Sequence, residues 1–131
     1  MKRAIFLALA LASICSCNNL ECERIESLEG TFLLILDETS GNCGAQDPVI
    51  VTYPSASDPA CARLTNEYSD HDCRQVATVE CVYSSGTVRT QSDWTQIDED
   101  GSREGTWTTT ITAPNGAVEC ASTYDVSLMR Q

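Results

Sequence analysis

Cysteines are the residues of this chain whose type and spacing point most directly to chemistry. Two of the eight close a hydrophobic leader, and six lie in a body rich in Thr and Ser. The leader pair is Cys15 and Cys17, and the six disulfide candidates are Cys22, Cys43, Cys61, Cys73, Cys81 and Cys120. No two are spaced as CxxC, which argues against a zinc knuckle and a thioredoxin-like redox pair. Because cysteines of exported domains usually pair with one another, we expect three disulfides and no bound metal.

The only histidine offers the clearest opening for acid–base chemistry. His71 lies between Asp70 and Asp72, and such carboxylates can orient an imidazole as a general base. The chain has many Ser and Thr residues but no Gly-x-Ser-x-Gly elbow, so no nucleophile can be named. We therefore predict a polar loop beside a disulfide here, with no cofactor and no enzymatic activity.

A second acidic cluster surrounds Gly101. Asp98, Asp100 and Glu104 resemble half of a calcium-binding loop, in which carboxylates at alternate positions hold the ion. The further ligands that a complete loop needs are missing from the sequence. We predict a solvated hairpin tip without a metal.

The beginning of the chain has the parts of an export signal. Lys2 and Arg3 give a positive start, and an uninterrupted apolar run from Ala4 to Ile14 follows. This run is shorter than the roughly 20 residues of a membrane-spanning helix, but it has the usual length of a signal-peptide core. No comparable run occurs later, so we expect no transmembrane helix in the mature protein.

The tetrapeptide Ile-Cys-Ser-Cys at 14–17 resembles the signal of bacterial lipoproteins, which has an aliphatic residue, a small residue and then an obligatory Cys. The resemblance implies a signal peptide over 1–16, lipidation of Cys17, and a tether that completes 17–29. Cleavage there leaves one cysteine for the lipid and six to pair. By resemblance to Gram-negative sorting, Asn18 implies an outer-membrane lipoprotein facing the periplasm or the cell surface. The alternative is cleavage after Ala12, which leaves eight cysteines and a secreted protein.

Composition narrows the class of partner. The net charge of −11 becomes −13 when Lys2 and Arg3 are removed with the leader, and the mature chain then has no lysine. Such a surface repels nucleic acid and anionic lipid headgroups. We therefore expect no nucleic-acid partner, contact with the membrane through the lipid anchor, and an unknown protein or small molecule as the other partner.

The remaining chain, 30–131, is long enough for one domain, and it alternates as β-strands do. Six strands are expected, at 31–36, 49–53, 74–83, 87–97, 104–112 and 117–129. The residues 54–72 between the second and third strands read as an irregular loop, with a short helix possible at 61–67. Asn115-Gly116 predicts a type I′ turn in the last hairpin.

The expected fold is an all-β antiparallel meander of about six strands, stapled by disulfides. Its closure is open to two interpretations, a small barrel or a two-sheet sandwich, with the barrel slightly favoured. Six cysteines allow 15 connectivities. Among them, Cys61 and Cys73 flank the irregular loop and would close it, while Cys81 and Cys120 lie on apolar faces and would pair across the interior.

Three sequence cues resemble short cysteine-containing bacterial lipoproteins of unknown function with a lipocalin-like or β-sandwich body. They are Gly30-Thr31-Phe32, the Ser-Gly-Asn-Cys-Gly at 40–44, and the Cys-x-Ser-x-Tyr-Asp-Val at 120–126. The resemblance implies a fold and a location and brings no activity with it.

Three aromatic residues at strand positions bear on function: Trp94, Trp107 and Tyr124. Aromatics at such positions usually belong to a core, and a six-stranded barrel would be nearly filled by its own side chains. We therefore expect a surface binding or structural module. The alternative is a carrier that holds a small apolar ligand in the barrel interior, and an internal cavity lined by these residues would distinguish the two.

Overall fold

The computed structural model describes residues 21–54, 58–84 and 86–131. The signal peptide expected at 1–16, the lipidation site Cys17 and the first part of the tether therefore lie outside the described residues. No helix in the described ranges is long and apolar enough to cross a membrane.

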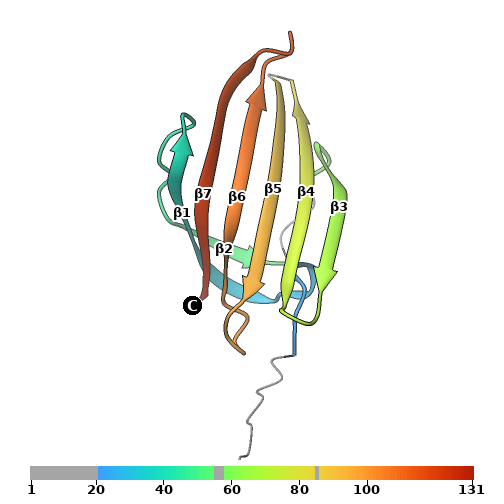
Figure 1. Ribbon diagram of the computed structural model, residues 1–131, viewed down its shortest axis with the longest axis vertical. Helices are drawn as coiled ribbons and strands as arrows, with labels where there is room; N and C mark the ends of the chain where they lie inside the picture. The colour runs from blue at the N-terminus through green and yellow to red at the C-terminus, as the bar shows by residue number, and fades with distance from the viewer. Residues whose placement is uncertain (1–20, 55–57, 85) are drawn as a thin grey trace, which may run out of the picture.

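Seven antiparallel strands form a single sheet (Figure 1). A short 3-10 turn, η1 (Ile25–Ser27), precedes them. The strands are β1 (Gly30–Gly41), β2 (Val49–Tyr53), β3 (Cys61–Ser69), β4 (Arg74–Tyr83), β5 (Gly86–Gln96), β6 (Arg103–Thr112) and β7 (Val118–Arg130). Their order in the sheet is β2-β1-β7-β6-β5-β4-β3, so the meander from β3 to β7 continues into β1 and β2.

The sheet curls into an open half-barrel. β1 bends across the concave side, and its partner β2 lies opposite β4 and β5 (Figure 1). Within the described residues β2 and β3 are the two ends of the sheet and do not pair with each other. The expected closed barrel and the expected sandwich are therefore both wrong, although the all-β antiparallel class is confirmed.

Close approach of β5 and β6 depends on a residue without a side chain. Gly105 lies opposite Trp94 in the β5–β6 register. A Cβ atom built on Gly105 would lie 1.7 Å from the main-chain oxygen of Asp93. Only glycine fits such a contact, and glycine in a strand commonly marks a sharp bend or close backbone approach. The missing side chain lets β5 and β6 approach closely beside Trp94.

A compact apolar core fills one end of the half-barrel. Its buried members are Leu28, Phe32, Trp94, Tyr124, Val126 and Leu128. Three alternate residues of β7, Tyr124, Val126 and Leu128, contribute to it, as the alternation of that strand predicts. Leu28 and Phe32 are fully buried, so the segment that enters the sheet is packed as part of the body from its first turn.

The seventh strand is β3, which occupies residues predicted to be irregular or helical. Most of its residues are exposed, because β3 is an edge strand with the core on only one side. A register shift between Arg63 and Thr65 also breaks its alternation. A strand with this pattern has almost no apolar period to detect, and the prediction of a loop or short helix is wrong for that reason.

The last hairpin also differs from its prediction. Ala113 N donates to Ala117 O at 2.8 Å, and Gly116 N donates to Ala113 O at 2.9 Å. Gly116 has φ +83°, but Asn115 is not among the residues with positive φ. The turn is therefore a type I turn closed by a left-handed glycine, and the predicted type I′ turn, which needs positive φ at both central residues, is wrong. Pro114 at the second turn position favours this geometry.

All six body cysteines are paired, as predicted, but with different partners from those considered. The disulfides are Cys22–Cys73, Cys43–Cys120 and Cys61–Cys81. The expected pairs Cys61–Cys73 and Cys81–Cys120 are wrong. The reason is β3, which places Cys61 directly opposite Cys81 on the neighbouring strand. Cys73 then lies in the β3–β4 turn, where it reaches the N-terminal segment.

Candidate ligand-binding trough

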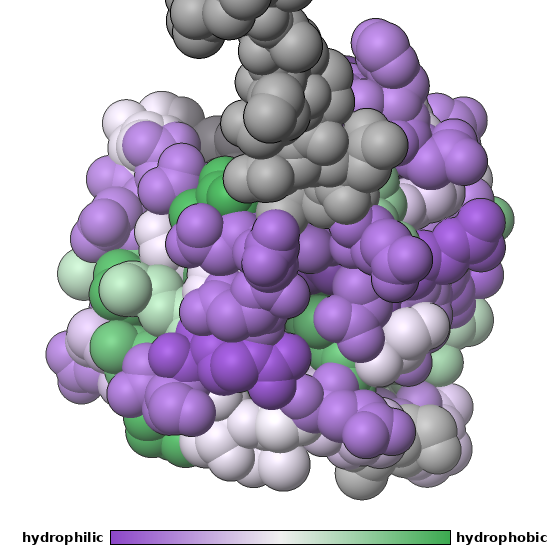
Figure 2. Space-filling model, turned by 90° about the horizontal axis from the view of Figure 1, so that it is seen from below, coloured by the Kyte–Doolittle hydropathy of each residue, from purple (hydrophilic) through white to green (hydrophobic). Residues whose placement is uncertain are grey.

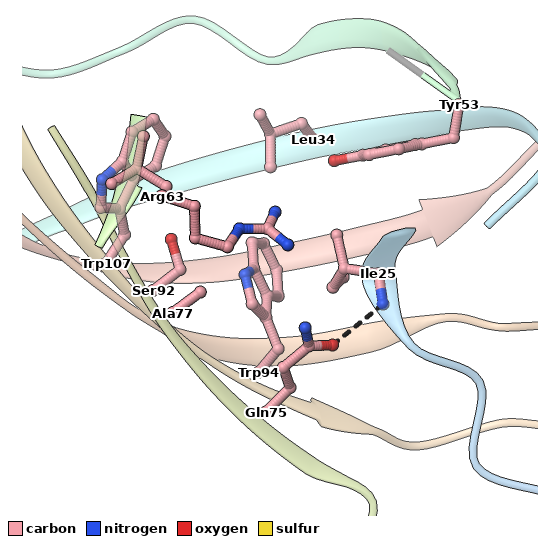
Figure 3. Close-up of a pocket in the computed structure, with 10 residues that line it drawn as sticks. Ile25, Leu34, Tyr53, Arg63, Gln75, Ala77, Ser92, Trp94 and Trp107 are labelled. Carbon is pink, nitrogen blue, oxygen red and sulfur yellow. Dashed lines mark hydrogen bonds between the residues drawn. The ribbon is translucent and has the colours of Figure 1, made fainter. Parts of the chain in front are cut away.

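A hollow runs along the concave face between β1–β2 on one side and β4–β6 on the other. Its main part is a cavity of about 260 Å³ (Figure 3). The lining residues are Ile25, Leu34, Tyr53, Arg63, Gln75, Ala77, Val79, Ser92, Trp94 and Trp107. We call this cavity the trough. It lies beside the core, where the half-barrel is too wide for its own side chains to fill.

Aromatic rings form much of its wall. Trp94 of β5 and Trp107 of β6 project into the trough from neighbouring strands, and Tyr53 of β2 and Leu34 of β1 face them from the opposite side (Figure 3). Trp94 is only 8% exposed. The indole Nε1 of Trp107 is buried and has no hydrogen-bond partner in the described part of the chain. The trough thus presents flat apolar surfaces, with the unpaired indole N–H of Trp107 buried behind them.

Arg63 brings a positive charge into this mainly apolar wall. It extends from edge strand β3 into the trough, and its guanidinium lies above Trp94 in Figure 3. Its Nη1 donates to the carboxylate of Glu26. The two side chains are 40% and 34% exposed, so the ion pair contributes little to stability. The main effect of the ion pair is to fix the position of the Arg63 guanidinium in the trough.

Glu26 is the centre of a hydrogen-bond network at the rim of the trough. Asn66 Nδ2 donates to its Oε1 at 2.6 Å, and Gln75 Nε2 donates to both oxygens at 3.0 and 3.1 Å. Partial burial acts to raise the pKa of Glu26. Hydrogen bonds from its own main-chain N–H and from Gln75, with the charge of Arg63, outweigh burial and lower that pKa. The carboxylate therefore remains ionised and holds Arg63 in place.

The N-terminal segment, residues 21–29, closes one end of the trough. Two buried glutamines hold its main chain: Gln75 Oε1 accepts from Ile25 N at 2.9 Å, and Gln96 Oε1 accepts from Glu23 N at 2.7 Å. The disulfide Cys22–Cys73 joins the same segment to the β3–β4 turn. Seen from this end, the surface is mostly hydrophilic (Figure 2). The segment is a plug that separates the trough from solvent on this side.

A second arginine lies beneath the plug. Arg103 is 1% exposed, and its Nη2 donates to the main-chain oxygen of Glu23. Its Nε and Nη1 are buried without a hydrogen-bond partner among the residues that the structure describes. Burial lowers the pKa of Arg103, while the nearby charge of Glu23 opposes this change. Burial also raises the pKa of Tyr53, and the charge of Arg103 acts against that rise.

A smaller cavity of about 200 Å³ continues the hollow toward the other end of the sheet. Its lining residues are Leu36, Cys43, Gln46, Trp107, Thr109, Ile111 and Tyr124. Trp107 lines both cavities. The three aromatics singled out in the sequence therefore all border the hollow, but Trp94 and Tyr124 lie in different parts of it and also belong to the core.

The other sequence candidates lie on exposed turns. His71 is exposed in the β3–β4 turn and lines neither cavity. Asp72 Oδ1 accepts from Arg74 N at 3.3 Å, and a hydrogen bond from Ser69 lowers the pKa of Asp72. Asp100 Oδ1 accepts from Ser102 N at 2.9 Å. Both aspartates therefore stabilise turns, and no metal-binding group of His, Cys, Asp or Glu occurs in the described ranges.

Sequence reasoning missed the polar residues of the trough. Arg63 and Asn66 lie on β3, which was not predicted as a strand, and Glu26 lies in the expected tether. Gln75 stands in a predicted strand on the same face as Ala77, and a glutamine on an apolar face was the one available signal. Comparison with protein-family models, curated proteins and solved structures finds no match to this chain.

Proposed function

We propose that this protein is an exported, membrane-anchored binding module that holds a small, partly apolar ligand in the trough. One observation carries the proposal: two tryptophans on adjacent strands face a cavity that the protein's own side chains leave open. Ligand sites are typically concave and mostly apolar, with a few polar groups that fix orientation. Arg63, Gln75 and Ser92 are such groups here. We assign no catalytic role, because the histidine lies outside the cavities.

The lipid anchor and the outer-membrane location are part of the proposal. Three disulfides are consistent with an exported protein. A lipid on Cys17 would hold the domain at the outer membrane, since two or more acyl chains anchor a protein stably. Cys22 is tied to the sheet, so only residues 18–21 would separate the lipidated residue from the folded body. The trough would then operate close to the membrane surface.

Intact-mass measurement of the native protein tests the anchor. The expected species begins at Cys17, carries three acyl chains and contains no free thiol. A native chain that begins at Ser13 without lipid would establish the secreted alternative. Detection of reduced cysteines among the six body residues would contradict the disulfides as well.

Binding of a neutral aromatic probe tests the trough. The fluorescence of N-phenyl-1-naphthylamine is expected to rise with wild-type protein. Trp107→Ala should weaken its binding about tenfold, because a buried aromatic contact of this kind is worth about 1–2 kcal/mol or more. Ser92→Phe should weaken it as well by filling the cavity. Thr108→Ala, on the exposed face of the same strand, is the matched control and should leave affinity unchanged.

Circular dichroism and a disulfide count would establish that each variant is folded. Equal binding by wild type and both cavity variants would show that the probe binds elsewhere. Absence of probe binding to the wild-type protein would leave the purely structural module as the better interpretation.

A further inference from the structure

The charge that borders the trough differs in sign from the charge of the whole chain. The chain carries 19 acidic residues and only 8 Lys and Arg. Arg63 is nevertheless the one ionised side chain among the residues that line the larger cavity. The other arginines that the described strands carry toward the surface already have partners. Arg74 is bound to Asp93 and Arg89 to Glu80, and Arg130 donates to main-chain oxygens of Glu29 and Asp100.

Arg63 has an unused edge. Its contact with Glu26 is made through Nη1, and no hydrogen bond from Nε or Nη2 is present within the described residues. These two nitrogens form the side of a guanidinium that binds an anion with two parallel hydrogen bonds. Arg74 uses the same edge in this protein, since its Nε donates to Asp93 Oδ1 at 2.8 Å and its Nη2 to Oδ2 at 2.5 Å. An anion in the trough can therefore bind Arg63 without displacing Glu26.

The environment of Arg63 favours an anion in spite of the acidic surface. Glu26 is already satisfied by Asn66 and Gln75 as well as by Arg63. Arg103 is not among the residues that line the trough, so Arg63 is the group that an anion there would contact. Carboxylates on the outer surface are screened beyond roughly 8–10 Å at physiological salt, whereas the Arg63 guanidinium would contact a ligand in the trough directly.

We infer that the natural ligand of the trough is an amphipathic anion, with an apolar or aromatic body against Trp94 and Trp107 and a carboxylate or similar acidic group on the Nε–Nη2 edge of Arg63. This inference rests on the proposed function and names the chemical class of its ligand. Selectivity for the acid over a neutral analogue of the same shape would come from Arg63.

Two fluorescent probes with the same ring system test the inference. 8-Anilino-1-naphthalenesulfonate carries an acidic group that N-phenyl-1-naphthylamine lacks. Wild-type protein is expected to bind the sulfonate about tenfold more tightly, since hydrogen bonds to a charged group are worth roughly 1.5–3 kcal/mol. Arg63→Gln should abolish this preference and leave affinity for the neutral probe within about twofold. Arg63→Lys should retain part of it, because lysine keeps the charge but cannot make the two-point contact.

Arg89→Gln is the matched control, because it removes the same charge from the exposed outer face. It should change the affinity for neither probe. If Arg89→Gln lost the preference for the sulfonate as fully as Arg63→Gln, a general charge effect would be shown and the inference would be overturned. Equal binding of both probes to wild type, or an unchanged preference in Arg63→Gln, would overturn it too while leaving the proposed function standing. Failure of both probes to bind would defeat the proposed function itself.

Discussion

Replacement of Gly105 by alanine is expected to destabilise the domain by about 3 kcal/mol or more, the upper range for forcing extra atoms into a packed site. The added methyl group would lie 1.7 Å from the main-chain oxygen of Asp93 and 3.1 Å from Cα of Trp94. Both are backbone atoms of the neighbouring strand, so no side-chain rotation can relieve the contact. The β5–β6 ladder would have to separate beside Trp94, which lines the trough.

Urea unfolding under non-reducing conditions measures this effect, and Gly44→Ala is the control. Gly44 has φ +98°, which strains any other residue, but no atom lies within 4 Å of its added methyl group. It should cost only about 1–2 kcal/mol, the penalty of the left-handed region. If Gly44→Ala were the more damaging change, β5 and β6 would not approach each other as closely as described.

Loss of the Cys43–Cys120 disulfide is expected to have the largest effect among the three cross-links. It closes the longest loop, with a sequence separation of 77 residues, against 51 for Cys22–Cys73 and 20 for Cys61–Cys81. The chain-entropy relation gives about 4.5, 4 and 3 kcal/mol in that order. Small domains have a net free energy of unfolding of about 5–15 kcal/mol, so removal of the Cys43–Cys120 bond would leave little of it.

Double alanine variants of each pair, unfolded in urea without reductant, would establish the order. The Cys61–Cys81 pair is the internal reference, because the β3–β4 ladder holds these two residues opposite each other even without the bond. The Cys43 side has less support: its main-chain N–H donates to Ser122 Oγ at 2.7 Å, within the loop that follows β1. A greater loss from the Cys61–Cys81 variant would contradict the entropic argument.

The strands that the sequence predicts well are those that bury one face on the core. In β7, Ser122, Tyr124, Val126 and Leu128 are all buried, and they alternate with residues that are exposed or half-buried. β3 lacks such a period because it is an edge strand with a bulge. Because this strand was not predicted, two disulfide pairs were also predicted wrongly. The predicted closure into a barrel or sandwich was wrong for a related reason. Alternation of apolar and polar residues specifies which face of a strand is buried, but not whether the two edge strands of the sheet pair.

The trough was predictable only in part. Its aromatic residues stand at alternating strand positions, where the sequence marks them as inward-facing. Arg63 and Glu26 come from segments about 37 residues apart that read as loop and tether. Their meeting depends on the plug and on the Cys22–Cys73 link, and neither follows from local pattern.

The Cys22–Cys73 bond also determines how mechanical load would travel through the molecule. Tension that enters from the N-terminal side reaches the sheet at Cys22 and passes directly into the β3–β4 turn. Residues 23–29, which include the fully buried Leu28, lie beyond that junction and would be loaded only after it. If Cys17 carries the proposed lipid anchor, tension from the membrane would therefore act first on the Cys22–Cys73 cross-link, and the residues that line the trough would be shielded from it.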